Sequence, residues 1–211
     1  MENQDRETEK IHKENRETDA PKRMKDMNPE EKKAYIKSEV LSYVLYLLIA
    51  VVITIFLLNF VGQRMVVNGP SMENTLHDGE SLIVDKLSYR FSDPKRFDIV
   101  VFPYKYEENT LFIKRVIGLP GETVRIDHFG KIYINGEVLE ENYGRETILS
   151  PGRAVEEITL GSDEYFVLGD NRNNSTDSRD PFVGNIKKSE FVGRAFLRIW
   201  PLDKFGFIRH Q

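Results

Sequence analysis

The pattern of hydrophobic and polar residues divides the chain into three parts. Residues 1–27 mix charges of both signs with almost no aliphatic side chains, so they cannot bury enough apolar surface to fold. Residues 40–61 read VLSYVLYLLIAVVITIFLLNFV and contain no charge. Beyond them, short runs of β-branched and aromatic residues alternate with turn residues. We therefore predict a disordered tail, one apolar helix and a β-rich domain.

The apolar run is long enough to cross a hydrocarbon core about 30 Å thick as a helix. A buried core helix of this length would keep a polar face, and a cleaved secretory signal would have a shorter apolar core and a following Ala-x-Ala site. Asn28 and Pro29 provide an N-cap and a first helical residue, so we expect a helix to begin there. We interpret residues 40–61 as an uncleaved signal anchor.

The charges that flank the anchor predict its orientation. Only Arg64 follows it closely, whereas residues 20–39 just before it contain six basic residues: Lys22, Arg23, Lys25, Lys32, Lys33 and Lys37. By the positive-inside rule, the predicted tail of residues 1–39 is cytoplasmic, and residues 62–211 form an extracytoplasmic domain. The expected location is the cell membrane, with a single pass.

The outer domain has the pattern of antiparallel β structure. Asn135-Gly136 between two apolar arms is a strong hairpin signal. In residues 192–200, Ala195, Leu197 and Ile199 alternate with Arg194, Phe196 and Arg198, which predicts two opposite faces of a strand. The predicted fold class is mostly β: an antiparallel barrel or sandwich, with a smaller β insertion at about residues 118–163, behind one transmembrane helix.

Composition excludes several kinds of function. The formal net charge of −4 provides no basic field for nucleic acid. The chain has no cysteine, which excludes disulfides and thiolate metal sites, and its four histidines do not pair at ligand spacing. We therefore expect no nucleic acid, no metal and no cofactor.

Ser71 lies in Asn68-Gly69-Pro70-Ser71-Met72, about ten residues beyond the anchor, and so within about 35 Å of it. A serine after Gly-Pro is usually a turn residue. A catalytic serine needs a base and oxyanion donors. His77 is one candidate base, although its segment reads as a polar surface turn.

Lys114 is the second candidate base, in the predicted strand 111–117. A two-residue period places Phe112, Lys114 and Val116 on one face and mostly apolar residues on the other. Apolar cover on both faces would desolvate the ammonium and lower the pKa of the lysine, as a general base requires. The strand alone leaves open the alternative that the ammonium snorkels to water from an edge.

Residues 169–181 form a third polar stretch, GDNRNNSTDSRDP. A solvated loop is one interpretation. A calcium loop is another, because Asp170, Asn171, Asn173 and Asp177 offer oxygen ligands, but no spaced Glu or Gly completes a known geometry.

Taken together, the motifs resemble bacterial type I signal peptidases, particularly those of Gram-positive bacteria. The matching stretches are Gly-x-Ser-Met-x-x-Thr-Leu at 69–76, Asp-Ile-Val-Val-Phe at 98–102, Lys-Arg-Val-Ile-Gly-Leu-Pro-Gly at 114–121, and Gly-Asp-Asn-Arg-x-Asn-Ser-x-Asp-Ser-Arg at 169–179. The resemblance implies a membrane-bound serine endopeptidase that cleaves signal peptides from exported preproteins with a Ser/Lys dyad, without a cofactor. Its expected partners are preproteins and the lipid bilayer, and we expect a monomer.

The resemblance also implies roles for individual residues. Ser71 would be the nucleophile and Lys114 the general base, with Ser175 orienting the lysine amine. Asp177 would pair with both Arg115 and Arg179 as scaffold.

Around the nucleophile, Gly69, Met72 and Leu76 would shape the oxyanion region and small substrate pockets. The chain departs from the family pattern at three positions. Gly69 replaces a serine that adds an oxyanion donor in some members, Asn74 replaces a usual proline, and Phe97 replaces a common small residue.

Two alternatives remain open from the sequence. The protein could be a peptidase of the same clan with one dedicated substrate, or a non-catalytic membrane-anchored β domain that binds partners. A serine-directed acylating probe distinguishes the second, because a binding domain has no activated hydroxyl.

Overall fold

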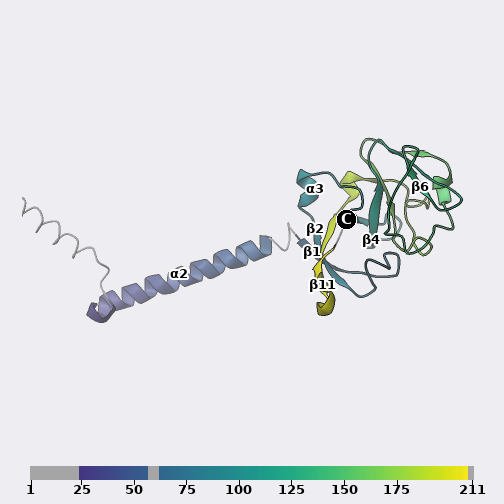
Figure 1. Cartoon of the computed structure of the whole chain (residues 1–211). Coiled ribbons are helices and arrows are strands. Elements are labelled where there is room, and N and C mark those ends of the chain that lie inside the picture. The colour runs from purple at the N-terminus through teal and green to yellow at the C-terminus, as the bar shows by residue number, and fades with distance from the viewer. Residues whose placement is uncertain (1–23, 57–61, 209–211) are drawn as a thin grey trace, which may run out of the picture. The chain divides into compact units, whose positions relative to one another are not determined.

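The structure is a computed structural model that describes residues 24–56 and 62–208 (Figure 1). The described residues fall into two compact units, which divide between Thr54 and Ile55. The predicted disordered tail lies outside the described residues up to position 23. Its last part differs from the prediction, because Met24–Asp26 forms a turn of 3-10 helix, η1.

The apolar helix, α2, spans Pro29–Phe56 and begins where the sequence predicts. Asn28 Oδ1 accepts a hydrogen bond from the Glu31 backbone N–H at 2.8 Å, and the Glu31 carboxylate accepts one from the Asn28 N–H at 2.9 Å. This reciprocal capping box fixes the start of the helix. Among the described residues, α2 is the one helix long and apolar enough to cross a membrane. Residues 57–61 of the predicted anchor lie outside the described part.

The second unit is mostly antiparallel β, as predicted. Within the described residues, its larger sheet has eight strands in the order β1-β2-β11-β3-β4-β9-β10, and β12 pairs with β11. The bounds are β1 Gly62–Val66, β2 Ser81–Asp85, β3 Ile99–Pro103, β4 Leu111–Gly118, β9 Glu164–Leu168, β10 Ile186–Lys187, β11 Gly193–Trp200 and β12 Gly206–Phe207.

The smaller sheet, in the order β7-β6-β5-β8, comprises β5 Thr123–Ile126, β6 Ile132–Ile134, β7 Glu137–Val138 and β8 Ile158–Thr159. Its strands fall inside the predicted insertion, whose limits of 118–163 stay a prediction. Short helical elements complete the unit: α3 Ser88–Phe91, η3 Gly152–Val155, η4 Lys188–Glu190 and η5 Leu202–Lys204.

The predicted hairpin forms between β6 and β7. Asn135 and Gly136 have φ values of 51° and 81°, and Ile134 pairs with Glu137 across the turn. Two consecutive residues with positive φ are the requirement of a type I′ turn, which Asn-Gly meets at low steric cost.

Strand β4 carries Lys114 through the middle of the larger sheet, between β3 and β9. Val116 packs in one hydrophobic cluster with Val100 and Val167, whereas Ile113 packs in another on the opposite face. Both faces of the strand are therefore covered, as its apolar pattern predicts.

Strand β11 differs from the predicted alternation. Its register against β2 shifts between Ala195 and Leu197 and again between Arg198 and Trp200. A bulge inserts an extra residue and reverses the orientation of the side chains that follow. Arg198 consequently pairs with buried Leu82 and shares its face, whereas the predicted two-residue period placed it opposite Ala195.

Candidate active site

Ser71 and Lys114 meet although 43 residues separate them in sequence. Ser71 begins a turn over residues 71–75 that follows β1, and Lys114 extends from β4. Lys114 Nζ lies 2.8 Å from Ser71 Oγ and donates a hydrogen bond to the Ile113 carbonyl at 3.0 Å. The amine is thus held by its own strand and directed at the serine hydroxyl.

The environment of Lys114 favours its neutral form. Only 3% of the residue is exposed, and this burial lowers the pKa of the amine from 10.5 to about 8, against the opposing attraction of Asp177 and Asp170. Desolvation wins because removing an ammonium from water costs more than these two carboxylates return. A usable fraction of the lysine is therefore neutral near physiological pH.

The polar loop after β9 holds the backbone of the Ser71 turn. The Asn171 N–H donates to the Ser71 carbonyl at 3.1 Å, and Asn171 Nδ2 donates to the Pro70 carbonyl at 3.1 Å. Gly169 permits this approach, because a Cβ at that position would lie 2.5 Å from the Ser71 carbonyl oxygen. Only glycine fits such a close contact between two backbones.

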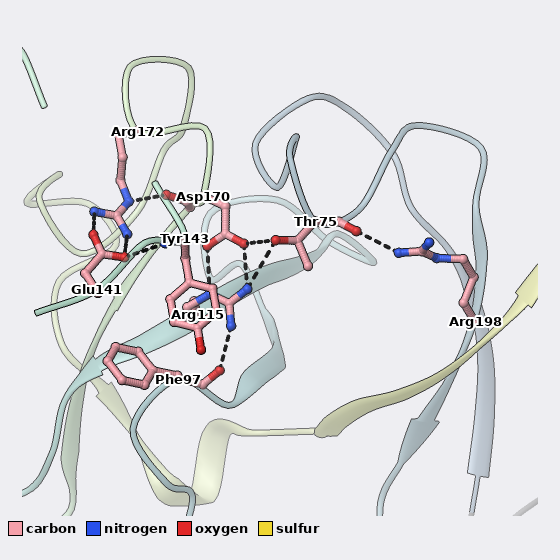
Figure 2. A network of polar contacts seen from close by, with 9 residues as sticks. Thr75, Phe97, Arg115, Glu141, Tyr143, Asp170, Arg172 and Arg198 are labelled. Carbon is pink, nitrogen blue, oxygen red and sulfur yellow. Dashed lines mark hydrogen bonds and ion pairs between the residues drawn. The ribbon is translucent and has the colours of Figure 1, made fainter. Parts of the chain in front are cut away.

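Arg115 and Asp170 form a fully buried ion pair beneath the turn (Figure 2). Arg115 donates to both carboxylate oxygens of Asp170 at 2.8 and 2.7 Å, and to the Phe97 carbonyl at 2.9 Å. The Tyr143 ring covers its guanidinium at 3.7 Å. This corrects the expected pairing of Arg115 with Asp177, since Asp170 provides the planar, bidentate acceptor that a guanidinium prefers.

Asp177 instead serves Arg179, as the resemblance implies for this second pair. Arg179 Nε and Nη2 each lie 2.8 Å from the Asp177 carboxylate, which also accepts the Gly169 N–H at 3.0 Å. The pair therefore fixes the start and the end of the polar loop, consistent with a scaffold.

Ser175 lies beside the dyad without making the expected bond. Its Oγ is buried and has no hydrogen-bond partner among the described residues, because the Lys114 amine contacts Ser71 and the Ile113 carbonyl. Ser175 still lines the same pocket as Ser71 and Lys114.

A pocket of about 290 Å³ opens above the dyad. Its walls come from the edge strand β1, from β4 and from residues 174–176 of the polar loop, and Gly69 and Met72 also line it. Leu76, expected to shape this pocket, lies fully buried in the hydrophobic core instead. The turn directs its side chain inward, so Leu76 supports the nucleophile from below.

Asn74 and Phe97, which depart from the family pattern, both have positive φ. Asn74 has φ 96°, a conformation that the fixed φ of a proline near −65° would not permit. Phe97 has φ 71°, which costs a bulky residue about 1–2 kcal/mol. Its ring is buried, with its centroid 5.0 Å from that of Tyr143, and this contact opposes the strain.

The other candidate base occupies the surface turn that the sequence predicts. His77 Nδ1 lies 3.4 Å from Glu73, and 41% of the His77 side chain is exposed. It thus has a carboxylate neighbour and solvent, but not the desolvated surroundings of Lys114.

Sequence reasoning missed several residues that support the site. Thr75 Oγ1 bonds the Asp170 carboxylate, and Arg172 forms an ion pair with Glu141 at 2.7 Å. Thr75 and Arg172 lie inside the quoted motifs, so their positions were visible but their partners were not. No sequence pattern pointed to Arg198, because a bulge in β11 determines the orientation of its side chain.

In the β domain, a serine hydroxyl contacts a buried, partly neutral lysine at the base of a pocket. This is the arrangement of a serine hydrolase. The family model described as "Signal peptidase, peptidase S26" matches residues 40–200. The chain therefore belongs to the signal peptidase family S26, whose members are serine peptidases.

Two relatives found by sequence, one from Synechocystis and one from Bacillus, agree with this assignment. A "Probable signal peptidase I-2" of Synechocystis sp. is 40% identical over 164 residues, 75% of this chain and 72% of that one. A "Signal peptidase I" of Bacillus amyloliquefaciens is 36% identical over 185 residues, covering 84% and 97%. A crystal structure of a signal peptidase I from Enterococcus faecalis is 35% identical, covers 49% of this chain and 97% of that one, and has a TM-score of 0.40.

Proposed function

We propose that the protein removes signal peptides from exported preproteins, with Ser71 as nucleophile and Lys114 as general base. The observation that carries this proposal is the 2.8 Å approach of Lys114 Nζ to Ser71 Oγ in a setting that lowers the pKa of the lysine to about 8. Membership of the signal peptidase family supports the choice of substrate.

The reaction begins when neutral Lys114 takes the Ser71 hydroxyl proton as Oγ attacks the scissile carbonyl carbon. The Ser71 backbone N–H helps to hold the oxyanion of the tetrahedral intermediate. The protonated lysine then gives its proton to the leaving amine as the C–N bond breaks. Lys114, neutral again, activates a water molecule that hydrolyses the acyl ester and releases Ser71.

The pocket favours an extended peptide with small side chains near the cut. β1 is an edge strand of the sheet, and residues 65–66 of β1 and 111–113 of β4 line the pocket. An edge strand provides free backbone groups with which an extended peptide can pair. Met72 and the neighbouring apolar side chains leave room for residues such as alanine at the first and third positions before the cut.

Membrane attachment would bring the enzyme to its substrate. In this proposal α2 crosses the cell membrane with the N-terminus in the cytoplasm, and the β domain faces the outer surface as a monomer. Because only about fifteen residues separate the end of α2 from Ser71, the site stays within about 50 Å of the helix end. A signal peptide held in the bilayer presents its cleavage site in this zone.

Cleavage of a test preprotein by the detergent-solubilised protein checks the proposal. We expect one new N-terminus at the signal-peptide boundary, read by mass spectrometry. Ser71→Ala should reduce the rate by about 10⁴-fold or more, because the acyl-enzyme cannot form. Ser150→Ala, which changes an exposed serine, should leave the rate unchanged. Cleavage at the same site by Ser71→Ala would contradict the proposal.

A further inference from the structure

Arg198 reaches the Ser71 turn from the opposite side to the polar loop (Figure 2). The bulge in β11 brings it to the core face of the sheet, where Leu82 is its register partner. Its side chain is 17% exposed, and its Nε lies 2.9 Å from the carboxylate of Glu80, of which 3% is exposed. Bulges beside active sites commonly redirect a side chain in this way.

The guanidinium of Arg198 holds the last residue of the turn. Its Nη2 donates a hydrogen bond to the Thr75 carbonyl at 2.7 Å. Thr75 is also held through its hydroxyl by Asp170, while Asn171 holds the Ser71 carbonyl at the beginning of the turn. The turn that carries the nucleophile is therefore fixed at its first residue by the polar loop, and at its last residue by both the loop and β11.

The Glu80–Arg198 ion pair is expected to add little net free energy to folding. Desolvating two charges commonly cancels their attraction, so a buried ion pair is seldom retained for stability alone. Lys204 Nζ also approaches Glu80, at 3.6 Å, but 43% of the Lys204 side chain is exposed. Arg198 is the partner that connects the buried carboxylate to the turn.

We propose that Arg198 is a positioning residue: it fixes the Thr75 carbonyl, and through the turn it keeps Ser71 Oγ aligned with Lys114. The Glu80 carboxylate, 2.9 Å from Arg198 Nε, keeps the guanidinium beside the turn by the attraction of its charge. The inference rests on the proposed function, because alignment matters only if Ser71 and Lys114 react. Displacement of a reacting group by about 1 Å can reduce a rate by about 10²-fold.

The test separates alignment from stability with steady-state cleavage of a peptide that spans a signal-peptide boundary, and with thermal unfolding of the same full-length samples. For Arg198→Met we expect kcat to fall by about 10- to 100-fold with KM within about twofold, because Arg198 itself does not line the pocket. Thermal stability also falls, because Glu80 loses its buried partner.

The double variant Arg198→Met/Glu80→Gln makes the test decisive. Neutralising Glu80 removes a buried charge whose remaining cation is the partly exposed Lys204, so the unfolding temperature recovers while kcat stays low, because the Thr75 carbonyl still lacks its donor. Arg194→Met is the matched control. This arginine lies on the same strand, 3.8 Å from Asp98, and its loss should leave kcat within about twofold.

Recovery of both kcat and the unfolding temperature in the double variant would overturn the inference, as would unchanged kcat in Arg198→Met. Ser71→Ala in the same assay distinguishes a failure of the proposed function from a failure of the role proposed for Arg198. If it still cleaves, the proposed function fails and this inference falls with it. If it is inactive while Arg198→Met is fully active, only this inference fails.

Discussion

Replacing Lys114 with methionine is expected to abolish cleavage and leave the domain folded. Methionine fills a similar volume but cannot accept the Ser71 proton, so we expect a loss of about 10⁴-fold in kcat, as for other residues of catalytic triads and dyads. The measurement is cleavage of a test preprotein. Lys131→Met, at an exposed position, is the control and should keep full activity. Substantial cleavage by Lys114→Met would remove the lysine from the mechanism.

The same variant should be at least as stable as the parent protein at neutral pH. The folded state lowers the pKa of Lys114 from 10.5 to about 8, so between these values the unfolded chain binds more protons than the folded one. Stability therefore rises with pH across this window, and below it the buried lysine costs the folded state on the order of 3 kcal/mol. Methionine removes that cost, and urea denaturation at pH 7 and pH 10 would show the difference.

The second large effect is expected from Asp170→Asn. Arg115 and Asp170 are both 0% exposed, so the change leaves a buried guanidinium without its counter-charge. Removing one partner of a buried pair typically costs about 3–5 kcal/mol, which is a large share of the stability of a domain of this size. We expect a loss near the lower value, since asparagine keeps one oxygen acceptor, and activity should fall as the Ser71 turn loosens.

Urea denaturation provides the measurement for Asp170→Asn. The matched control is Asp163→Asn, at an exposed position on the surface, which should change the free energy of unfolding by less than about 0.5 kcal/mol. A similarly small change in Asp170→Asn would show that the buried pair does not support the fold.

Local signals predicted most of the fold. Asn28 and Pro29 marked the start of α2, the Asn135-Gly136 turn formed its hairpin, and the apolar faces of β4 were covered. Each of these depends on residues close together in sequence. The bulge in β11 was missed because the alternation of Ala195, Leu197 and Ile199 matches an unbroken strand, and only pairing with β2 determines where the extra residue lies.

The site was less accessible to sequence reasoning. For Lys114, the strand pattern alone left burial and snorkelling as alternatives, and the family resemblance favoured burial; the structure has the residue 3% exposed. The predicted partner of Arg115, Asp177, was wrong. Asp170 and Asp177 lie in one motif, and their sequence spacing does not tell which carboxylate faces the arginine. Contacts between distant segments decide both questions.

The central claim is that a neutral Lys114 activates Ser71, and the pH dependence of Ser71 acylation tests it most directly. The rate constant for labelling by a serine-directed acylating probe should rise with pH, with a midpoint at about 8, and then level off as the amine becomes fully neutral. A midpoint near 6.5, the value of an ordinary histidine, or a rate independent of pH between about 6 and 10, would contradict the account.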